Sequence, residues 1–200
     1  MPISGSRNDC AVAVIPAAVE LLRALGPVLA AYGRWYLFGA QAVTLFGVPR
    51  LSADVDVTLK LSSDSPDELL AAMRAAGFTL RIDDPEFVRR TRVLPFLHEA
   101  TGMPLDIVLA GSGLEDEFLD RARVVDLGGV EVPVISPEDL VIAKVLAGRP
   151  KDTEDVRGVL RAQGPGLDAA RIERILGLLE EALGQGDLLP AWRALRDRDR

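Results

Sequence analysis

Two aspartates separated by one residue are the residues in this chain most able to do chemistry. Asp54 and Asp56 alternate with apolar residues in a run that predicts a strand over 54–61, so both carboxylates project from the same face of a sheet. Two neighbouring carboxylates repel each other, and burying them is costly unless a cation lies between them. A hard divalent ion such as Mg²⁺ takes oxygen ligands and keeps water and phosphate oxygens in its shell. The pair therefore predicts a magnesium site, with Mn²⁺ as an alternative ion.

A third acid supports this interpretation. Asp106 interrupts the otherwise apolar run 105–109, which predicts a strand. If that strand neighbours the strand of Asp54, three carboxylates converge on one place. That layout suits one or two Mg²⁺ ions that activate an oxygen nucleophile and clamp a triphosphate. The alternative is an isolated charge on an edge strand.

A candidate phosphate cradle precedes the acids. The pattern predicts a strand over 35–38, then Gly39, then a helix over 40–46. A glycine lets the backbone approach a ligand, and the free N–H groups at a helix N-terminus favour anions. Gly39, Ala40 and Gln41 are therefore candidates for nucleotide contacts, although the same pattern also describes an ordinary turn between a strand and a helix.

The elements that position these residues follow from hydrophobic spacing and from glycine and proline punctuation. The first expected helix begins at Pro16, and we expect Gly26 and Pro27 to kink or split it. Further elements are expected at 65–76 (helix), 78–82 (strand), 91–98 with 104–110 (hairpin), 124–134 (hairpin), and 137–147, 150–163, 168–183 and 187–198 (helices). The fold class is therefore α+β. We expect a loose leader over 1–14, an α/β core over 15–135 and a helical C-terminal part over 136–200.

Composition excludes several classes of protein. The chain has 200 residues and a formal net charge of −7, so a large basic footprint for duplex DNA is not expected. The single cysteine, Cys10, excludes an internal disulfide and is typical of a reducing compartment. The apolar stretches are broken well short of the roughly 20 residues of a membrane span. We therefore expect a cytoplasmic protein with no membrane partner, in which the lone His98 is structural or on the surface.

These residues resemble the nucleotidyltransferase superfamily, which has the DNA polymerase β-like fold. The family pattern is a hydrophobic residue, Gly, and Gly or Ser, followed by Asp-hydrophobic-Asp/Glu-hydrophobic. This chain reads Phe38-Gly39-Ala40, thirteen further residues, and then Asp54-Val55-Asp56-Val57, and Asp106 matches the third acid. The stretch Gly47-Val48-Pro49-Arg50-Leu51-Ser52 looks like the Gly-x-x-Arg-x-Ser/Thr segment of minimal bacterial members. Residues 138–155 look like the Lys and Lys/Arg-Asp-x-x-Asp region of the toxin-like AbiEii group.

The resemblance implies a mixed sheet with flanking helices, followed by a helical C-terminal part. It implies Mg²⁺-dependent transfer of a nucleoside monophosphate from an NTP to a hydroxyl, with release of pyrophosphate. The residues carried over as catalytic are Asp54, Asp56 and Asp106, which are also the metal ligands, and Lys144. Asp106 would be the third ligand or the base. The residues carried over as nucleotide-binding are Gly39, Ala40, Gln41, Arg50, Ser52, Lys151 and Asp152.

The acceptor stays open at this point. An RNA such as tRNA, a protein side chain and a small molecule such as an aminoglycoside all offer hydroxyls, and the toxin-like members imply a cognate antitoxin as a candidate partner. Ala40 departs from the Gly or Ser of the family pattern, which removes a hydroxyl contact to phosphate and keeps the backbone N–H contacts. The alternative function is a non-catalytic nucleotide- or partner-binding module with the same fold. Three converging acids argue against it.

Overall fold

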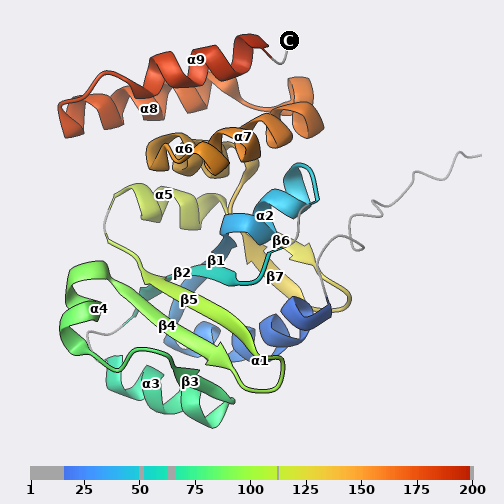
Figure 1. Ribbon diagram of the computed structural model, residues 1–200, viewed down its shortest axis with the longest axis vertical. Coiled ribbons are helices and arrows are strands. Elements are labelled where there is room, and N and C mark those ends of the chain that lie inside the picture. The colour runs from blue at the N-terminus through green and yellow to red at the C-terminus, as the bar shows by residue number, and fades with distance from the viewer. Residues whose placement is uncertain (1–15, 50–51, 63–65, 112, 199–200) are drawn as a thin grey trace, which may run out of the picture.

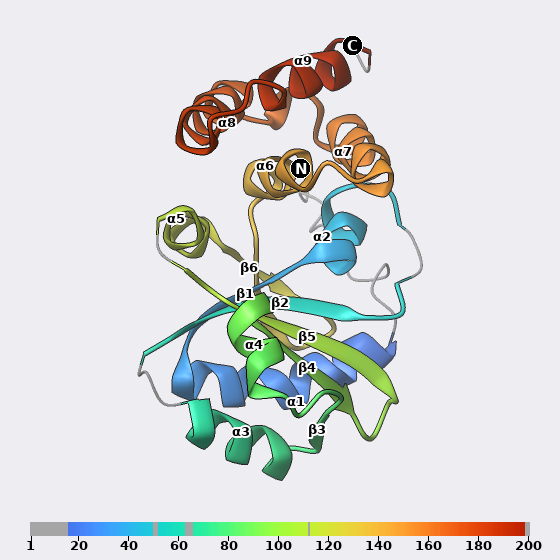
Figure 2. The same cartoon turned by 60° about the vertical axis from the view of Figure 1, so that its left-hand side comes forward.

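A computed structural model of the chain describes residues 16–49, 52–62, 66–111 and 113–198. The expected leader over 1–14 and Arg50 lie outside the described residues. Within them, seven strands form one mixed sheet in the order β3-β4-β5-β2-β1-β7-β6. Helices α1 and α3 lie on one side of this sheet, and α6 to α9 are stacked at the opposite end of the molecule (Figures 1 and 2). The α+β class and the helical C-terminal part are confirmed.

The elements follow the expected order. The strands are β1 (Gly33–Phe38), β2 (Val55–Leu61), β3 (Phe78–Leu80), β4 (Val93–His98), β5 (Met103–Leu109), β6 (Arg123–Asp126) and β7 (Glu131–Val134). The helices are α1 (Pro16–Tyr32), α2 (Gly39–Phe46), α3 (Pro66–Ala75), α4 (Pro85–Thr91), α5 (Leu114–Arg121), α6 (Pro137–Ala147), α7 (Pro150–Gln163), α8 (Ala169–Leu183) and α9 (Leu188–Arg198), with a 3₁₀ segment η2 (Gly164–Gly166). None of the helices in the described ranges is long and apolar enough to cross a membrane.

Strand β2 lies at the centre of the sheet and determines its geometry. It is antiparallel to β1 and parallel to β5. Its alternating residues Val55, Val57 and Leu59 are fully buried, which fixes the face of the strand that meets the core. Asp56 belongs to the opposite face by the same alternation. The register of the strand therefore determines where the carboxylates lie.

Helix α1 is continuous through Pro27, so the split expected at this position does not occur. A proline inside a helix removes one backbone hydrogen bond. Leu25 and Leu29 on either side of Pro27 are fully buried, and so are Leu21 and Leu22 one turn earlier. This apolar packing under the sheet holds the helix together despite the missing bond.

The structure adds two short helices that the sequence pattern does not predict. Asp84 caps α4 by accepting a hydrogen bond from the backbone N–H of Glu86, and Pro85 occupies the first turn. Three acids in the first turn of α5 favour its N-terminus through the helix dipole. Both helices are short and have few buried side chains, so periodicity gives little signal for them.

A buried ion pair connects α6 to α8. The side chain of Asp139 is fully buried, and its Oδ1 accepts hydrogen bonds from Arg171 Nε at 3.0 Å and Nη2 at 2.7 Å. Ser136 donates to the other oxygen of Asp139 at 2.7 Å. Breaking one partner of such a pair costs about 3–5 kcal/mol. The pair therefore fixes the position of α6, a helix that faces the sheet across a pocket.

Candidate active site

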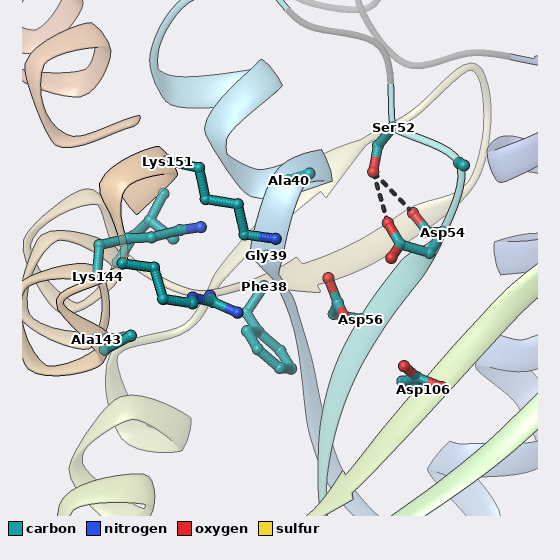
Figure 3. Close-up of a pocket in the computed structure, with 14 residues that line it drawn as sticks. Phe38, Gly39, Ala40, Ser52, Asp54, Asp56, Asp106, Ala143, Lys144 and Lys151 are labelled. Atoms are coloured by element: carbon teal, nitrogen blue, oxygen red, sulfur yellow. Dashed lines mark hydrogen bonds between the residues drawn. The ribbon is translucent and has the colours of Figure 1, made fainter. Parts of the chain in front are cut away.

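A pocket of about 500 Å³ lies between the sheet and helices α6 and α7. Its lining residues are Phe38, Gly39, Ala40, Ser52, Ala53, Asp54, Asp56, Asp106, Leu140, Ala143, Lys144, Ala147, Arg149 and Lys151. Figure 3 shows the three aspartates along the strand side of this pocket and the two lysines on the helical side. The fold thus brings acids and bases from distant parts of the sequence to opposite walls of one cavity.

The register of the sheet brings the aspartates together. Asp56 and Asp106 are directly paired across the parallel strands β2 and β5. The two strands are neighbours, as the three-acid interpretation required. Asp54 immediately precedes β2, which begins at Val55, one residue later than expected, and Asp54 Oδ1 accepts a hydrogen bond of 2.7 Å from Ser52 Oγ. Ser52 therefore orients a carboxylate, and both residues line the pocket.

The pKa of Asp56 is shifted by its surroundings in this cluster. Burial, together with the nearby carboxylates of Asp54 and Asp106, raises the pKa of Asp56 from 3.8 to about 6. Lys144 and Lys151 act in the opposite direction and favour the charged form. Burial is the largest of these effects, and the two lysines offset burial and the neighbouring acids only in part.

The junction between β1 and α2 reaches into the same space. Gly39 has a φ of +65°, and a Cβ atom at this position would lie 2.0 Å from Asp56 Oδ2. Gly39 and Ala40 both line the pocket. Gln41 is buried and donates from Nε2 to the carbonyl oxygen of Asp54 at 3.2 Å. This hydrogen bond holds the backbone of Asp54 in place. Gln41 itself is not among the residues that line the pocket.

Lys144 is held in a buried ion-pair cluster. Its Nζ donates to Asp152 Oδ1 at 2.9 Å and to Asp155 Oδ2 at 2.8 Å, and all three side chains are buried. Burial by itself would raise the pKa of Asp152, but hydrogen bonds from Arg149 and Lys144 outweigh it and hold that pKa below its usual range. The structure does not place Asp152 in the pocket, because both of its oxygens bind these cations across the turn between α6 and α7.

Two cations at the start of α7 face the acids. Lys151 is exposed and extends toward the aspartates (Figure 3). Arg149 also lines the pocket, and its Nε and Nη2 donate to Asp152 at 2.6 Å and 3.1 Å. The hydrogen bond to Asp152 raises the pKa of Arg149, and the charge of Asp56 raises it further. Sequence reasoning missed Arg149, although it lies two positions before Lys151 in the matched motif.

The apolar part of the pocket was also missed. Phe38 contributes from the end of β1, and Leu140, Ala143 and Ala147 contribute from one face of α6. Their spacing of three and four residues is the helical period. In the sequence these positions look like ordinary core residues of an amphipathic helix, so no local signal distinguishes them.

The donor set fits a divalent ion. Among the described residues, no three His, Cys, Asp or Glu side chains are arranged to hold a metal together as they stand. Asp54 is bound by Ser52, and Asp106 Oδ1 is bound by Arg81. However, the three carboxylates offer hard oxygen donors to one pocket, and these are the ligands that Mg²⁺ and Mn²⁺ prefer.

Solved structures share this fold. The antibiotic-resistance factor ANT(2'')-Ia, in its solution structure, is 15% identical with a TM-score of 0.53, covering 83% of this chain and 94% of that chain. Its crystal structure in complex with adenylyl-2''-tobramycin is 19% identical with a TM-score of 0.51, covering 82% and 99%. An antigenic nucleotidyltransferase-like protein from Paracoccidioides brasiliensis is 16% identical with a TM-score of 0.51, covering 89% and 92%. At these identities the likeness shows a common fold, that of nucleotidyltransferases.

The chain belongs to the family described as nucleotidyltransferases of unknown function (DUF6036), whose model matches residues 20–163. Among curated proteins, the sequence has no match. Family and fold together make the protein a nucleotidyltransferase, an enzyme of the transferase class, and they confirm the resemblance drawn from the glycine and aspartate motifs. Helices α8 and α9 lie beyond the matched region.

Proposed function

We propose that this protein transfers a nucleoside monophosphate from an NTP to a hydroxyl group and releases pyrophosphate. One observation carries the proposal: Asp54, Asp56 and Asp106 share a pocket with Arg149 and Lys151 on its opposite wall. Acids that bind a cation and bases that bind phosphates are the two halves of a site for a metal–triphosphate complex.

The metal half of the site is assigned to the aspartates. Asp54 and Asp56 would hold a divalent ion, Mg²⁺ or Mn²⁺, with Asp106 as the third ligand or as the base. When bound, such an ion neutralises the charge of the triphosphate and activates the attacking oxygen. Ser52 keeps Asp54 in its orientation through the hydrogen bond to Oδ1.

The phosphate half is assigned to three groups of this chain. Lys151 and Arg149 bind the triphosphate oxygens from the start of α7. Gly39 and Ala40 at the start of α2 line the same pocket, and their backbone N–H groups would bind phosphate at this helix N-terminus. This contact needs no side-chain hydroxyl, so Ala40 is compatible with the activity.

In the proposed step, one bond to the α-phosphorus forms while another breaks. The oxygen of the acceptor hydroxyl forms a bond to the α-phosphorus, and the bond from that phosphorus to the α,β-bridging oxygen breaks. Pyrophosphate leaves with the electron pair of the broken bond. The hydroxyl proton passes to a carboxylate, for which Asp106 is the assigned acceptor. Arg149 and Lys151 stabilise the charge that develops on the leaving group.

Lys144 takes a different role from the one that the motif implies. Its ammonium group is bound by Asp152 and Asp155, so it holds the turn between α6 and α7 and thereby positions Arg149 and Lys151. We propose Lys144 as a positioning residue and Lys151 as the residue that contacts the nucleotide.

The transfer assay uses NTPs labelled at the α- or the γ-phosphate, incubated with Mg²⁺ and one of three acceptor pools: RNA, protein or small hydroxylated molecules. The small molecules come first, because the structure of ANT(2'')-Ia contains adenylyl-2''-tobramycin. The proposal predicts that one pool gains α-label and no γ-label, and that Asp56→Asn abolishes the transfer. Transfer of γ-label to an acceptor would contradict the proposal. A protein that binds Mg²⁺–NTP but transfers no label to any pool would contradict it too.

A further inference from the structure

Arg81 contacts Asp106 from the β3 edge of the sheet. It follows the end of β3, and its backbone N–H donates to the carbonyl oxygen of Pro95 at 2.8 Å. Its Nε donates to the carbonyl oxygen of Phe96 at 3.0 Å, and its Nη2 forms an ion pair with Asp106 Oδ1. Pro95 is the residue paired with Asp106 across β4 and β5, so the arginine side chain spans one strand to reach the carboxylate.

The side chains of Arg81 and Asp106 are 38% and 35% exposed, so solvent screens the ion pair in part, but a second contact holds Arg81 in one geometry. Exposed pairs are weak because two long side chains must be held in one geometry. Here the guanidinium is fixed at a second point by the Phe96 carbonyl, and a planar guanidinium held in this way also fixes the direction of its partner. Asp106 lines the pocket, whereas Arg81 is not among the lining residues. Asp106 therefore lines the pocket and also binds a cation that lies outside the pocket lining.

We propose that Arg81 is a positioning residue that binds Asp106 through Oδ1 and so leaves Oδ2 for the reaction. The inference rests on the proposed function, because it assigns a geometry to the carboxylate that receives the acceptor proton. Without Arg81, both oxygens of Asp106 are free to turn toward a bound cation. Asp106 then becomes a stronger metal ligand and a poorly oriented base.

The charge of Arg81 adds a second, separable effect. A guanidinium bound to one of three clustered carboxylates offsets part of the negative charge that attracts a divalent ion. Its removal increases the net attraction, because opposite charges a few ångströms apart still interact measurably in a solvated site. Loss of Arg81 is therefore expected to tighten metal binding while slowing the reaction, a combination that general damage to the fold does not produce.

The test compares Arg81→Gln, Arg81→Lys and the wild type in the full-length protein. Arg34→Gln is the matched control, because Arg34, on β1 of the same sheet, forms an exposed ion pair with Asp120 of α5 and does not line the pocket. The first readout is the Kd of Mn²⁺ alone, measured by calorimetry. The second is steady-state pyrophosphate release with the acceptor pool that gains α-label, from which kcat and the KM for the NTP are separated. Melting curves establish that each variant is folded.

The proposal predicts that Arg81→Gln lowers the Kd of Mn²⁺ about fivefold. It predicts that the same variant lowers kcat by about ten- to a hundredfold with little change in KM, because a displaced catalytic group costs turnover. Arg81→Lys is expected to keep the Mn²⁺ affinity of the wild type and to recover kcat only in part, since an ammonium on a flexible stem lacks the planar fork that fixes the direction of Asp106. Arg34→Gln is expected to match the wild type in both readouts.

Weaker or unchanged Mn²⁺ binding in Arg81→Gln would overturn the proposal, and so would an unchanged kcat. Full recovery of kcat in Arg81→Lys would show that charge alone matters and would overturn the positioning role. A wild type that binds Mn²⁺ and transfers nothing to any pool would refute the proposed function separately. In that case the Mn²⁺ affinities alone decide whether Arg81 acts on Asp106.

Discussion

Gly39 and Asp56 lie closer together than any other residue at position 39 would allow. A Cβ atom on Gly39 would be 2.0 Å from Asp56 Oδ2 and 2.8 Å from its carboxyl carbon. The φ of +65° at Gly39 adds a backbone conformation that other residues adopt only with strain. The glycine is thus required by the carboxylate as well as by the turn, and the start of α2 and the acidic cluster form one structural unit.

Gly39→Ala tests this contact. The left-handed backbone costs about 1–2 kcal/mol in a non-glycine residue. Forcing Asp56 aside adds about 1–3 kcal/mol. A chain of this length loses about 2–4 °C in Tm for each kcal/mol, so a large drop is expected in thermal melts. Gly102→Ala is the control, because Gly102 has a φ of +64° with nothing within 4 Å of the added Cβ. Equal destabilisation by the two substitutions would contradict the close contact.

Asp56→Asn is expected to stabilise the metal-free protein at neutral pH. The pKa of Asp56 is raised to about 6 in the folded protein from 3.8. Between these values the folded state binds more protons than the unfolded state, so the stability of the wild type falls as the pH rises through this window. Above it the ionised carboxylate costs up to about 3 kcal/mol, at about 1.4 kcal/mol per pKa unit.

The measurement is the free energy of unfolding of the wild type and Asp56→Asn in EDTA at several pH values. The gain from asparagine should be largest above pH 6 and should vanish near pH 4. A gain that does not change with pH would show that the carboxylate is not destabilised by its surroundings.

Lys144→Met should cost far more stability than the same change at Lys151. Removing the ammonium of Lys144 leaves the buried carboxylates of Asp152 and Asp155 without this partner, and breaking a buried pair costs about 3–5 kcal/mol. Lys151 is exposed, so its replacement should stay within about 0.5 kcal/mol of the wild type. Denaturant melts of the two variants give the comparison. Equal losses would refute the structural role of Lys144.

Lys151→Met should instead weaken nucleotide binding. A hydrogen bond to a charged group is worth about 1.5–3 kcal/mol, so the Kd for Mg²⁺–NTP should rise by about ten- to a hundredfold. Lys60→Met is the control, since Lys60 pairs with Asp116 and does not line the pocket. Calorimetric titration of the folded variants measures this effect. An unchanged Kd in Lys151→Met would remove that residue from the site.

The sequence predicted the acids of the site better than its bases. Alternation along the expected strand predicted the face of Asp56, and the apolar run around Asp106 marked the neighbouring strand. Asp54 lies one residue before β2 and lines the same pocket. Both inferences use a period of two, which is a local property of the chain. Arg81 could not be found in this way, because its ion pair with Asp106 depends on the order of β3, β4 and β5 in the sheet.

The sequence motif does not distinguish the environments of Lys144 and Lys151. Lys144 and Lys151 are both carried over from the same matched region, and both line the pocket. Only the packing of α6 against α7 reveals that Lys144 is buried against two carboxylates while Lys151 is exposed. The same packing brings Arg149 to the pocket, which charge and spacing alone did not predict.

We propose that the aspartates and the cations of α7 together bind a metal–nucleotide complex. The most direct test is the change in Tm of the protein with each NTP, with and without Mg²⁺, beside the double variant Asp54→Ala/Asp56→Ala. A ligand at 100 times its Kd stabilises the folded state by about 2.7 kcal/mol, which corresponds to several degrees at this chain length. We expect a Mg²⁺-dependent rise in Tm that the double variant lacks. No rise with any NTP, or the same rise in the double variant, would contradict it.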